Sequence, residues 1–377
     1  MSNENEKRYQ KRLARIQNAI NLEPVDRVPC IFMGMAFAPR YMGMSQHKYC
    51  VDGTAAVDVT IEAMKRLGNV DGINQAPGGI HPMSMTYLWL SRLLIPGIDL
   101  DEEALWQVVE KEIMAKEDYD LVIDKGAYAL VDKILPQVCD MKMMEENFAW
   151  HETHGHGVNT KFCDAGFVVV SHGAVATPFD TLCGARSMNQ FFFDLYRMPD
   201  KVQEAMDAMV PYYIEQGMWS ADAGDVPGVW VGGWRTASAM LAPKLWDRFV
   251  WPYIKKISTA LIDGGVIPVL HWDQDWTRDL ERLLELPAKK CILNPDGMTD
   301  IRKAREVLKD HMAIMGDVPA SILSTGSPED VRNYIRDLIR DVGTEGLLIA
   351  PGCDAPLNTK PENMEALVAA TREFGVA

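Results

Sequence analysis

The chain has 377 residues, of which 47% are hydrophobic and 24% are charged, a composition that fits neither a disordered chain nor a membrane protein. Its formal net charge of −15 argues against nucleic acid or an anionic membrane as a partner, because both are bound through clustered Lys and Arg. No apolar stretch has transmembrane length, and the first residues are polar without a signal peptide, so we expect a cytoplasmic protein. The seven cysteines have no repeating spacing and do not form a disulfide framework.

The first half of the chain predicts a strand and several helices. Helical periodicity covers residues 8–20, an apolar run at 28–33 reads as the first strand, and a helix follows at 54–67. The segment from about 101 to 165 is mostly helical with charged faces, apart from a short strand at 121–123. We interpret the helix at the start as an extension and the 101–165 segment as an insertion.

From residue 167 onward, short apolar runs alternate regularly with helical patterns. Strands are predicted at 167–171, 228–231, 266–270, 290–293, 312–315 and 346–350, and helices at 178–196, 199–220, 243–263, 277–284, 298–308, 328–341 and 361–373. Strands that are apolar throughout and alternate with helices indicate a parallel sheet covered on both faces.

Two topologies accommodate such a sheet. An open doubly wound sheet usually carries a Gly-rich phosphate turn, and neither GxGxxG nor GxxxxGK[ST] occurs in the chain. Adding 28–33 and a strand near 69–74 to the later strands gives about eight, the number that closes a barrel. We therefore predict an α/β fold, a single (β/α)8 TIM barrel domain over residues 1–377, with its active site at the C-terminal ends of the strands.

Three side chains at predicted strand ends form a candidate metal site. His271 and Asp273 follow the 266–270 run, and Cys353 follows the 346–350 run. Residues at i and i+2 of a strand can point the same way, and a barrel brings distant strand ends together. One nitrogen, one oxygen and one sulfur suit Zn²⁺, and three protein ligands leave a fourth position for a substrate, as in catalytic zinc sites.

Other strand ends supply candidate substrate contacts and one further candidate catalytic carboxylate, Asp317. The predicted substrate-binding residues are Met33, Met35, His172, Trp234, Arg235, Trp272, Trp276 and Asn294. The Trp residues among them would line an aromatic pocket. For Asn294 and Asp317 a structural role in turns or helix caps is an equally good interpretation.

A second polar cluster places His151, His154 and His156 within six residues, close to Cys163. The spacing is not HExxH. We expect a solvated loop, with a loop over the barrel mouth that donates a ligand or a proton as the alternative.

The chain resembles the uroporphyrinogen decarboxylase superfamily over nearly its whole length. The resemblance is carried by the order and spacing of the segments EPVDRVP at 23–29, APKLWDRFVWPY at 242–253, GGVIPVLH at 264–271, MGDVP at 315–319, GSPEDV at 326–331 and GCDAP at 352–356. It implies a (β/α)8 barrel. Decarboxylases of this family carry an Arg-containing segment after the first strand, whereas here Arg40 is the one basic residue in that place, which disfavours a substrate with many carboxylates.

The resemblance to the methyltransferase branch implies zinc on a His-x-Cys pair and a distant Cys after Gly. In this chain Asp273 replaces the first of these thiolates, and Gly352–Cys353 keeps the second. Oxygen in place of sulfur makes zinc a harder Lewis acid, which favours an oxygen leaving group. We expect a methyltransferase that moves the methyl group of a methoxylated, aromatic small molecule to the Co(I) corrinoid of a separate protein, the first component of an O-demethylase system.

The corrinoid would come on a partner because the chain has no DxHxxG corrinoid-binding signature. One alternative is transfer in the other direction, from a methylcorrinoid to a thiol such as coenzyme M. Another is a barrel that binds a corrinoid or tetrapyrrole without catalysis.

Overall fold

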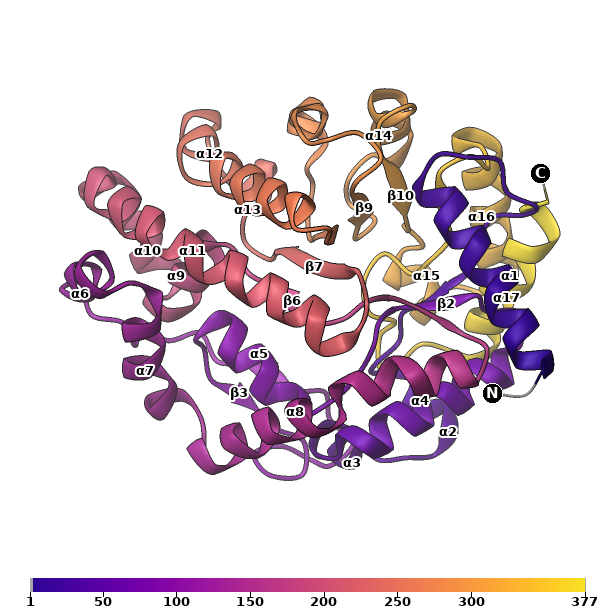
Figure 1. The fold of residues 1–377 in the computed structure, drawn as a ribbon, viewed down its shortest axis with the longest axis horizontal. Coiled ribbons are helices and arrows are strands. Elements are labelled where there is room, and N and C mark those ends of the chain that lie inside the picture. Colours follow the sequence, from indigo (N-terminus) through magenta and orange to yellow (C-terminus); the bar gives the residue numbers. More distant parts are fainter. Residues whose placement is uncertain (1–2, 377) are drawn as a thin grey trace.

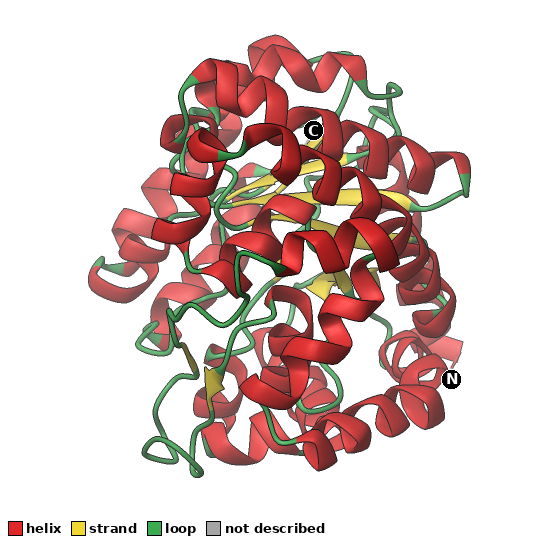
Figure 2. Ribbon diagram, turned by 90° about the vertical axis from the view of Figure 1, so that its left-hand side faces the viewer, coloured by secondary structure: helices red, strands yellow, loops and turns green. Residues whose placement is uncertain are grey.

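Parallel strands form the centre of the molecule and helices form its outer layer (Figure 1; Figure 2). This computed structural model describes residues 3–376. The strands are β1 (Ile31–Phe32), β2 (Gly72–Gln75), β5 (Val168–Ser171), β6 (Ala174–Val175), β7 (Gly228–Gly233), β8 (Ile267–Trp272), β9 (Ile292–Pro295), β10 (Ala313–Met315) and β11 (Leu347–Leu348), with a separate antiparallel pair of β3 (Leu93–Leu94) and β4 (Gln107–Val108).

The strands close into a barrel. One sheet has the order β1-β2-β5 and the other the order β11-β10-β9-β8-β7-β6. The two sheets join on one side because β5 and β6 belong to one extended segment that bends at Gly173. In this segment, the His172 N–H donates to the Gly228 carbonyl of β7 at 2.9 Å. They join on the other side through the Ile31 N–H, which donates to the Ile349 carbonyl at 2.8 Å. With β5 and β6 counted as one, the predicted (β/α)8 barrel is confirmed.

The helices cover the barrel and extend beyond it. They are α1 (Asn3–Ile20), α2 (Phe37–Met42), α3 (Gln46–Val51), α4 (Gly53–Leu67), α5 (His81–Trp89), α6 (Asp118–Lys125), α7 (Ala127–Val138), α8 (Met141–Asp164), α9 (Pro178–Arg186), α10 (Met188–Arg197), α11 (Pro199–Gly224), α12 (Pro243–Phe249), α13 (Trp251–Asp263), α14 (Ile301–Leu308), α15 (Ala320–Thr325), α16 (Pro328–Val342) and α17 (Pro361–Phe374), with 3-10 segments at Ser238–Met240 and Thr277–Glu285. Within residues 3–376, no helix combines the length and the apolar character needed to cross a membrane.

Two sequence-based expectations are wrong. Residues 121–123 lie in helix α6 and not in a strand. Their apolar character reflects the packed face of this helix, on which Val122 is buried. The histidine-rich segment is also helical, since His151, His154 and His156 lie on α8 and not in a loop.

Alternation along the strands separates two cores. Leu270 and Leu293 point outward and pack against the helices, whereas Val269 and Ile292 point into the barrel, where they meet the apolar face of α1. The lower part of the barrel interior is therefore apolar. Two residues further along β8 and β9, the inward positions are the polar residues His271 and Asn294.

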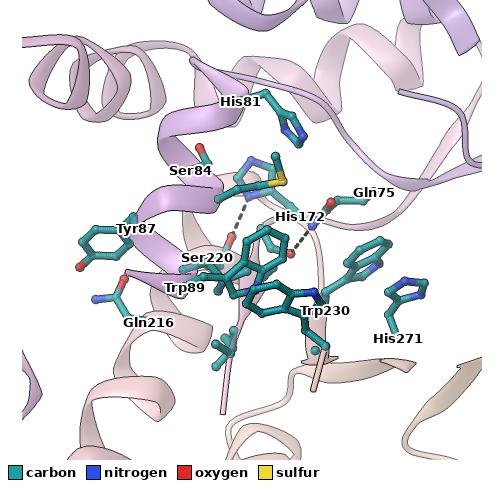
Figure 3. A pocket seen from close by; sticks show the side chains of 18 of the residues that line it. Gln75, His81, Ser84, Tyr87, Trp89, His172, Gln216, Ser220, Trp230 and His271 are labelled. Carbon is teal, nitrogen blue, oxygen red and sulfur yellow. Dashed lines mark hydrogen bonds between the residues drawn. The ribbon is translucent and has the colours of Figure 1, made fainter. Parts of the chain in front are cut away.

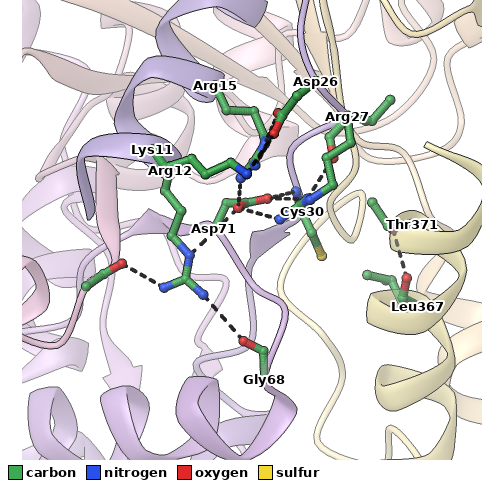
Figure 4. Close-up of polar contacts among 12 residues, drawn as sticks. Lys11, Arg12, Arg15, Asp26, Arg27, Cys30, Gly68, Asp71, Leu367 and Thr371 are labelled. Carbon is green, nitrogen blue, oxygen red and sulfur yellow. Dashed lines mark hydrogen bonds and ion pairs between the residues drawn. The ribbon is translucent and has the colours of Figure 1, made fainter. Parts of the chain in front are cut away.

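Helix α1 is fixed at the bottom of the barrel by a buried charge cluster (Figure 4). Asp71 is 0% exposed and accepts hydrogen bonds from Arg15 at 2.6 Å, from Arg27 at 2.7 Å and from the Cys30 N–H at 2.9 Å. Arg15 also holds Asp26 at 2.6 Å and keeps the pKa of that carboxyl well below its usual range. The EPVDRVP segment thus links α1 to the start of the first two barrel strands.

Removing the central charge should destabilise the whole fold. We expect Asp71→Asn to lower the free energy of unfolding by about 3–5 kcal/mol, because it leaves buried guanidinium groups without their anion. The exposed pair Glu4–Arg8 provides the control, since Glu4→Gln should change stability by less than about 0.5 kcal/mol. Chemical denaturation of both variants measures the difference, and equal stabilities would contradict the prediction.

Candidate active site

The three predicted metal ligands meet at the C-terminal end of the barrel. The candidate ligand atoms of His271, Asp273 and Cys353 all lie within 4.8 Å of one another, and His271 Nε2 is 3.6 Å from Asp273 Oδ1. A tetrahedral ion with zinc-like bonds separates its ligand atoms by roughly 3.3–3.7 Å. A small movement of the Cys353 side chain toward His271 and Asp273 would therefore allow the three ligand atoms to bind one ion.

The local backbone explains why these residues meet. His271 is the last inward residue of β8, and Asp273 follows two positions later, so the strand alternation points both to the barrel axis. Gly352 brings the Cys353 loop against the loop after β9, because a Cβ at this position would lie 2.5 Å from the Asp296 carbonyl oxygen.

A chain of hydrogen bonds assigns the proton on His271. The Trp230 indole N–H, which can only donate, is 2.9 Å from Asn74 Oδ1, so the Asn74 amide nitrogen faces Asn294 Oδ1 at 2.8 Å. Asn294 Nδ2 donates to the Met315 carbonyl at 2.8 Å, and its oxygen therefore accepts a hydrogen from His271 Nδ1 at 2.9 Å. This network leaves the Nε2 lone pair of His271 toward Asp273 and Cys353.

Burial favours the neutral form of each of the three groups. It lowers the pKa of His271 to about 4, and it raises the pKa of Asp273 to about 7, with a further contribution from Asp296. Burial and the nearby Asp273 and Asp354 raise the pKa of Cys353 well above its usual value. Asp273 and Cys353 bind a metal only when they are deprotonated, and His271 binds it when it is neutral. A divalent cation would supply the positive charge that stabilises the two anions.

The candidate ligands open into a cavity of about 540 Å³ (Figure 3). Trp230 stacks on the His271 ring with centroids 4.2 Å apart, and Trp89 stacks on Trp234 at 4.5 Å. The lining is mostly apolar and aromatic, and it includes no Lys or Arg among the described residues.

The predicted substrate contacts divide into two groups. Met33, Met35, His172 and Trp234 line the cavity. Arg235 stands behind Trp234, with its guanidinium 4.0 Å from that ring and 2.7 Å from Glu110. It supports the wall and is not part of the lining.

The other predicted residues lie in the structure around the site. Trp272 and Trp276 are each 2% exposed and stack on each other at 4.1 Å in the core, outside the cavity lining. Asn294 lies behind His271, as described above. Asp317, the candidate catalytic carboxylate, accepts a hydrogen bond from Tyr334 at 2.7 Å and does not line the cavity.

Several lining residues were not predicted. Trp89 and His81 come from α5, and His151 comes from α8, where its ring lies 6.1 Å from that of His172. Asp354 also lines the cavity and accepts the N–H groups of Met35 and Ala36. Trp230 had a signal in the sequence, because it lies in a predicted strand two residues before Gly232. The sequence also offered His151 as part of a loop over the barrel mouth, whereas the α5 residues had no signal.

Comparison with known proteins assigns the family. Residues 165–374 match the model of the uroporphyrinogen decarboxylase (URO-D) family. The chain belongs to this family.

Relatives of the chain carry two kinds of name. Over 381 residues it is 22% identical to uroporphyrinogen decarboxylase of Coxiella burnetii, covering 96% of this chain and 95% of that one. Over 135 residues it is 26% identical to the methylcobamide:CoM methyltransferase MtbA of Methanosarcina acetivorans, covering 36% of this chain and 38% of that one. A methyltransferase from Methanosarcina mazei shares the fold, with a TM-score of 0.72 at 16% identity over 96% of this chain and 98% of that one.

We predict that zinc content depends on the three candidate ligands. His271→Ala and Cys353→Ser should lose most of the bound zinc, because two ligands rarely hold a catalytic ion. Cys139→Ser is the matched control, since Cys139 is a partly buried thiol outside the cavity whose Sγ contacts the Leu135 carbonyl. Metal analysis of the three purified variants gives the stoichiometry, and unchanged zinc in Cys353→Ser would contradict the site.

We also predict that Asn294 tunes zinc affinity through His271. Asn294→Leu should weaken zinc binding by roughly 10–100-fold, because the imidazole loses the acceptor that fixes its tautomer. Asn294→Asp keeps an acceptor at this position and should retain more affinity than the Leu variant. Competition with a chromogenic chelator measures both, and equal affinities in the two variants would exclude this role.

Proposed function

We propose that this member of the URO-D family is a zinc-dependent methyltransferase that moves the methyl group of a methoxylated aromatic compound to the Co(I) corrinoid of a partner protein. The observation that carries the proposal is a His, Asp, Cys set opening into an aromatic cavity whose lining has no Lys or Arg. The proposed methyl transfer would be the first step of an O-demethylase system.

The cavity supports a methyl donor better than it supports uroporphyrinogen. A substrate with many carboxylates needs several fixed cations, and the described cavity lining offers none. A flat, weakly polar ring, by contrast, fits between aromatic side chains such as Trp230 and Trp234. The decarboxylase activity named for many relatives is therefore not our proposal for this chain.

Different residues of the site would have different roles in the reaction. His271, Asp273 and Cys353 would hold the ion, and Asn294 would keep the His271 Nε2 available for it. When bound, zinc would supply Lewis acidity at the oxygen of the methoxy group, where negative charge develops as the methyl group leaves. The aromatic walls exclude water and orient the ring so that the methyl carbon remains accessible to the corrinoid.

The composition of the ligand set favours an ether over a thiol. A carboxylate oxygen in place of a second thiolate leaves more positive charge on zinc, and a phenolate is a hard, oxygen-centred leaving group. The relative named as a methylcobamide:CoM methyltransferase supports the second candidate, transfer from a methylcorrinoid to a thiol. A corrinoid-binding barrel without catalysis is the third.

The test is a methyl-transfer assay with the purified zinc protein and a reduced corrinoid protein. We expect methoxyarenes to convert the Co(I) absorption spectrum to that of methyl-Co(III), whereas methylamines and methylthiols leave it unchanged. Cobalt that stays unmethylated with every methoxyarene would overturn the ether proposal.

A ligand exchange separates the two catalytic candidates. Asp273→Cys should keep zinc, because a thiolate is also a good ligand, and should lower the rate with methoxyarenes by about tenfold or more as the ion becomes a weaker Lewis acid. If the ether rate is unaffected by this exchange, the assigned role of Asp273 is incorrect.

A further inference from the structure

A second cavity, of about 440 Å³, lies beside the barrel mouth. It is enclosed by α2, the end of α4 and the segment 358–362 that begins α17. The same connection after β11 supplies Cys353, Asp354 and Pro356 to the main cavity, so the two cavities share one loop.

Three cations line the second cavity. Arg40 donates to the Leu357 carbonyl at 2.8 Å, Arg66 donates to the Tyr41 carbonyl at 3.1 Å, and Lys360 donates to the Gly326 carbonyl at 2.8 Å. Arg66 also stacks on the Tyr41 ring, with its guanidinium carbon 4.2 Å from the centroid. Lys360 also donates to the Thr325 carbonyl at 3.4 Å, whereas each guanidinium has N–H groups beyond the one that makes its carbonyl contact.

None of the three cations forms an ion pair with a carboxylate of residues 3–376, in a chain whose net charge is −15. The acid in the lining is Glu362, which is exposed on the first turn of α17. Three cations beside one exposed acid leave an excess of positive charge, which is unfavourable, so this arrangement indicates a ligand that brings negative charge.

A buried hydroxyl points to the same conclusion. Thr359 lines the cavity and is 4% exposed, and its side-chain oxygen has no hydrogen-bond partner within the described part of the chain. The hydroxyl stands immediately before α17, a helix of 14 residues whose N-cap Lys360 makes no side-chain cap. A buried polar atom without a partner is uncommon in a protein interior, and a bound oxyanion would satisfy it.

We propose that this second cavity binds a phosphate group. Two guanidinium groups and one ammonium match the charge and the several acceptor oxygens of a phosphoryl group, and Thr359, whose hydroxyl has no partner within the described residues, lines the same cavity. Two sources carry this chemistry: a free phosphoester, or the phosphodiester in the nucleotide tail of a complete corrinoid. The second source rests on the proposed function and on the closeness of this cavity to the barrel mouth.

Phosphate binding is tested directly with inorganic phosphate and the intact protein. Calorimetry should show saturable binding at constant ionic strength, and phosphate should raise the melting temperature more than chloride does. We expect the Arg40→Gln/Arg66→Gln variant to lose most of this affinity and Thr359→Val to weaken it severalfold. Lys244→Gln, which removes one exposed charge outside the cavity, should bind phosphate as the parent does.

The outcomes separate the proposal from the proposed methyl transfer, because the binding assay needs neither zinc nor turnover. No saturable phosphate binding, or equal binding in the parent and in both the Arg and Thr359→Val variants, would overturn the anion site. Thr359→Val retains the shape of the side chain and keeps the test valid should the double variant fold poorly.

A second pair of ligands identifies the source of the phosphate group. Cobalamin contains the phosphodiester, and cobinamide lacks it. If the corrinoid tail is the source, Arg40→Gln/Arg66→Gln should reduce the affinity for cobalamin to that for cobinamide. If a free phosphoester is the source, glycerol phosphate should bind in an Arg-dependent manner and the two corrinoids should bind alike.

Discussion

The chemistry available at the barrel mouth depends on which nitrogen of His271 carries its proton. The indole nitrogen of Trp230 can only donate a hydrogen bond. This property fixes which atom of the Asn74 and Asn294 side-chain amides is the donor and which is the acceptor. The constraint passes from β7 through Asn74 on β2 and Asn294 on β9 to His271 on β8, whose unprotonated nitrogen therefore faces Asp273 and Cys353. Residues outside the candidate ligand set therefore orient the proposed cation site.

The same layer explains why the two halves of the barrel interior differ. Along β8 and β9 the inward side chains change from Val269 and Ile292 to His271 and Asn294 within two residues. The apolar half needs no hydrogen bonds and packs on α1, whereas the polar half satisfies its donors within itself. The strand alternation thus gives one continuous interior with an apolar lower part and a polar upper part that carries the candidate site.

The barrel and the candidate ligands could be predicted from the sequence because their signals are local. Each strand is a short apolar run, and His271, Asp273 and Cys353 are defined by their position at the end of such a run. The cavity wall could be predicted only in part: Met33, Met35, His172 and Trp234 follow strands, whereas the contact of His151 on α8 with His172 arises through packing between segments distant in sequence. Trp272 and Trp276 were predicted to line the pocket because they follow a strand end. In the structure, both rings instead stack on each other in the core.

The ion cluster around Asp71 lies before the first residue of β2, at the opposite end of the strands from His271 and Cys353. Its stabilising interactions involve no residue that lines the reactive cavity. Loops at the mouth are therefore free to change length and composition while the anchor of α1 stays intact. Sequence changes at the C-terminal ends of the strands can therefore reshape the cavity while the N-terminal ends keep the barrel intact.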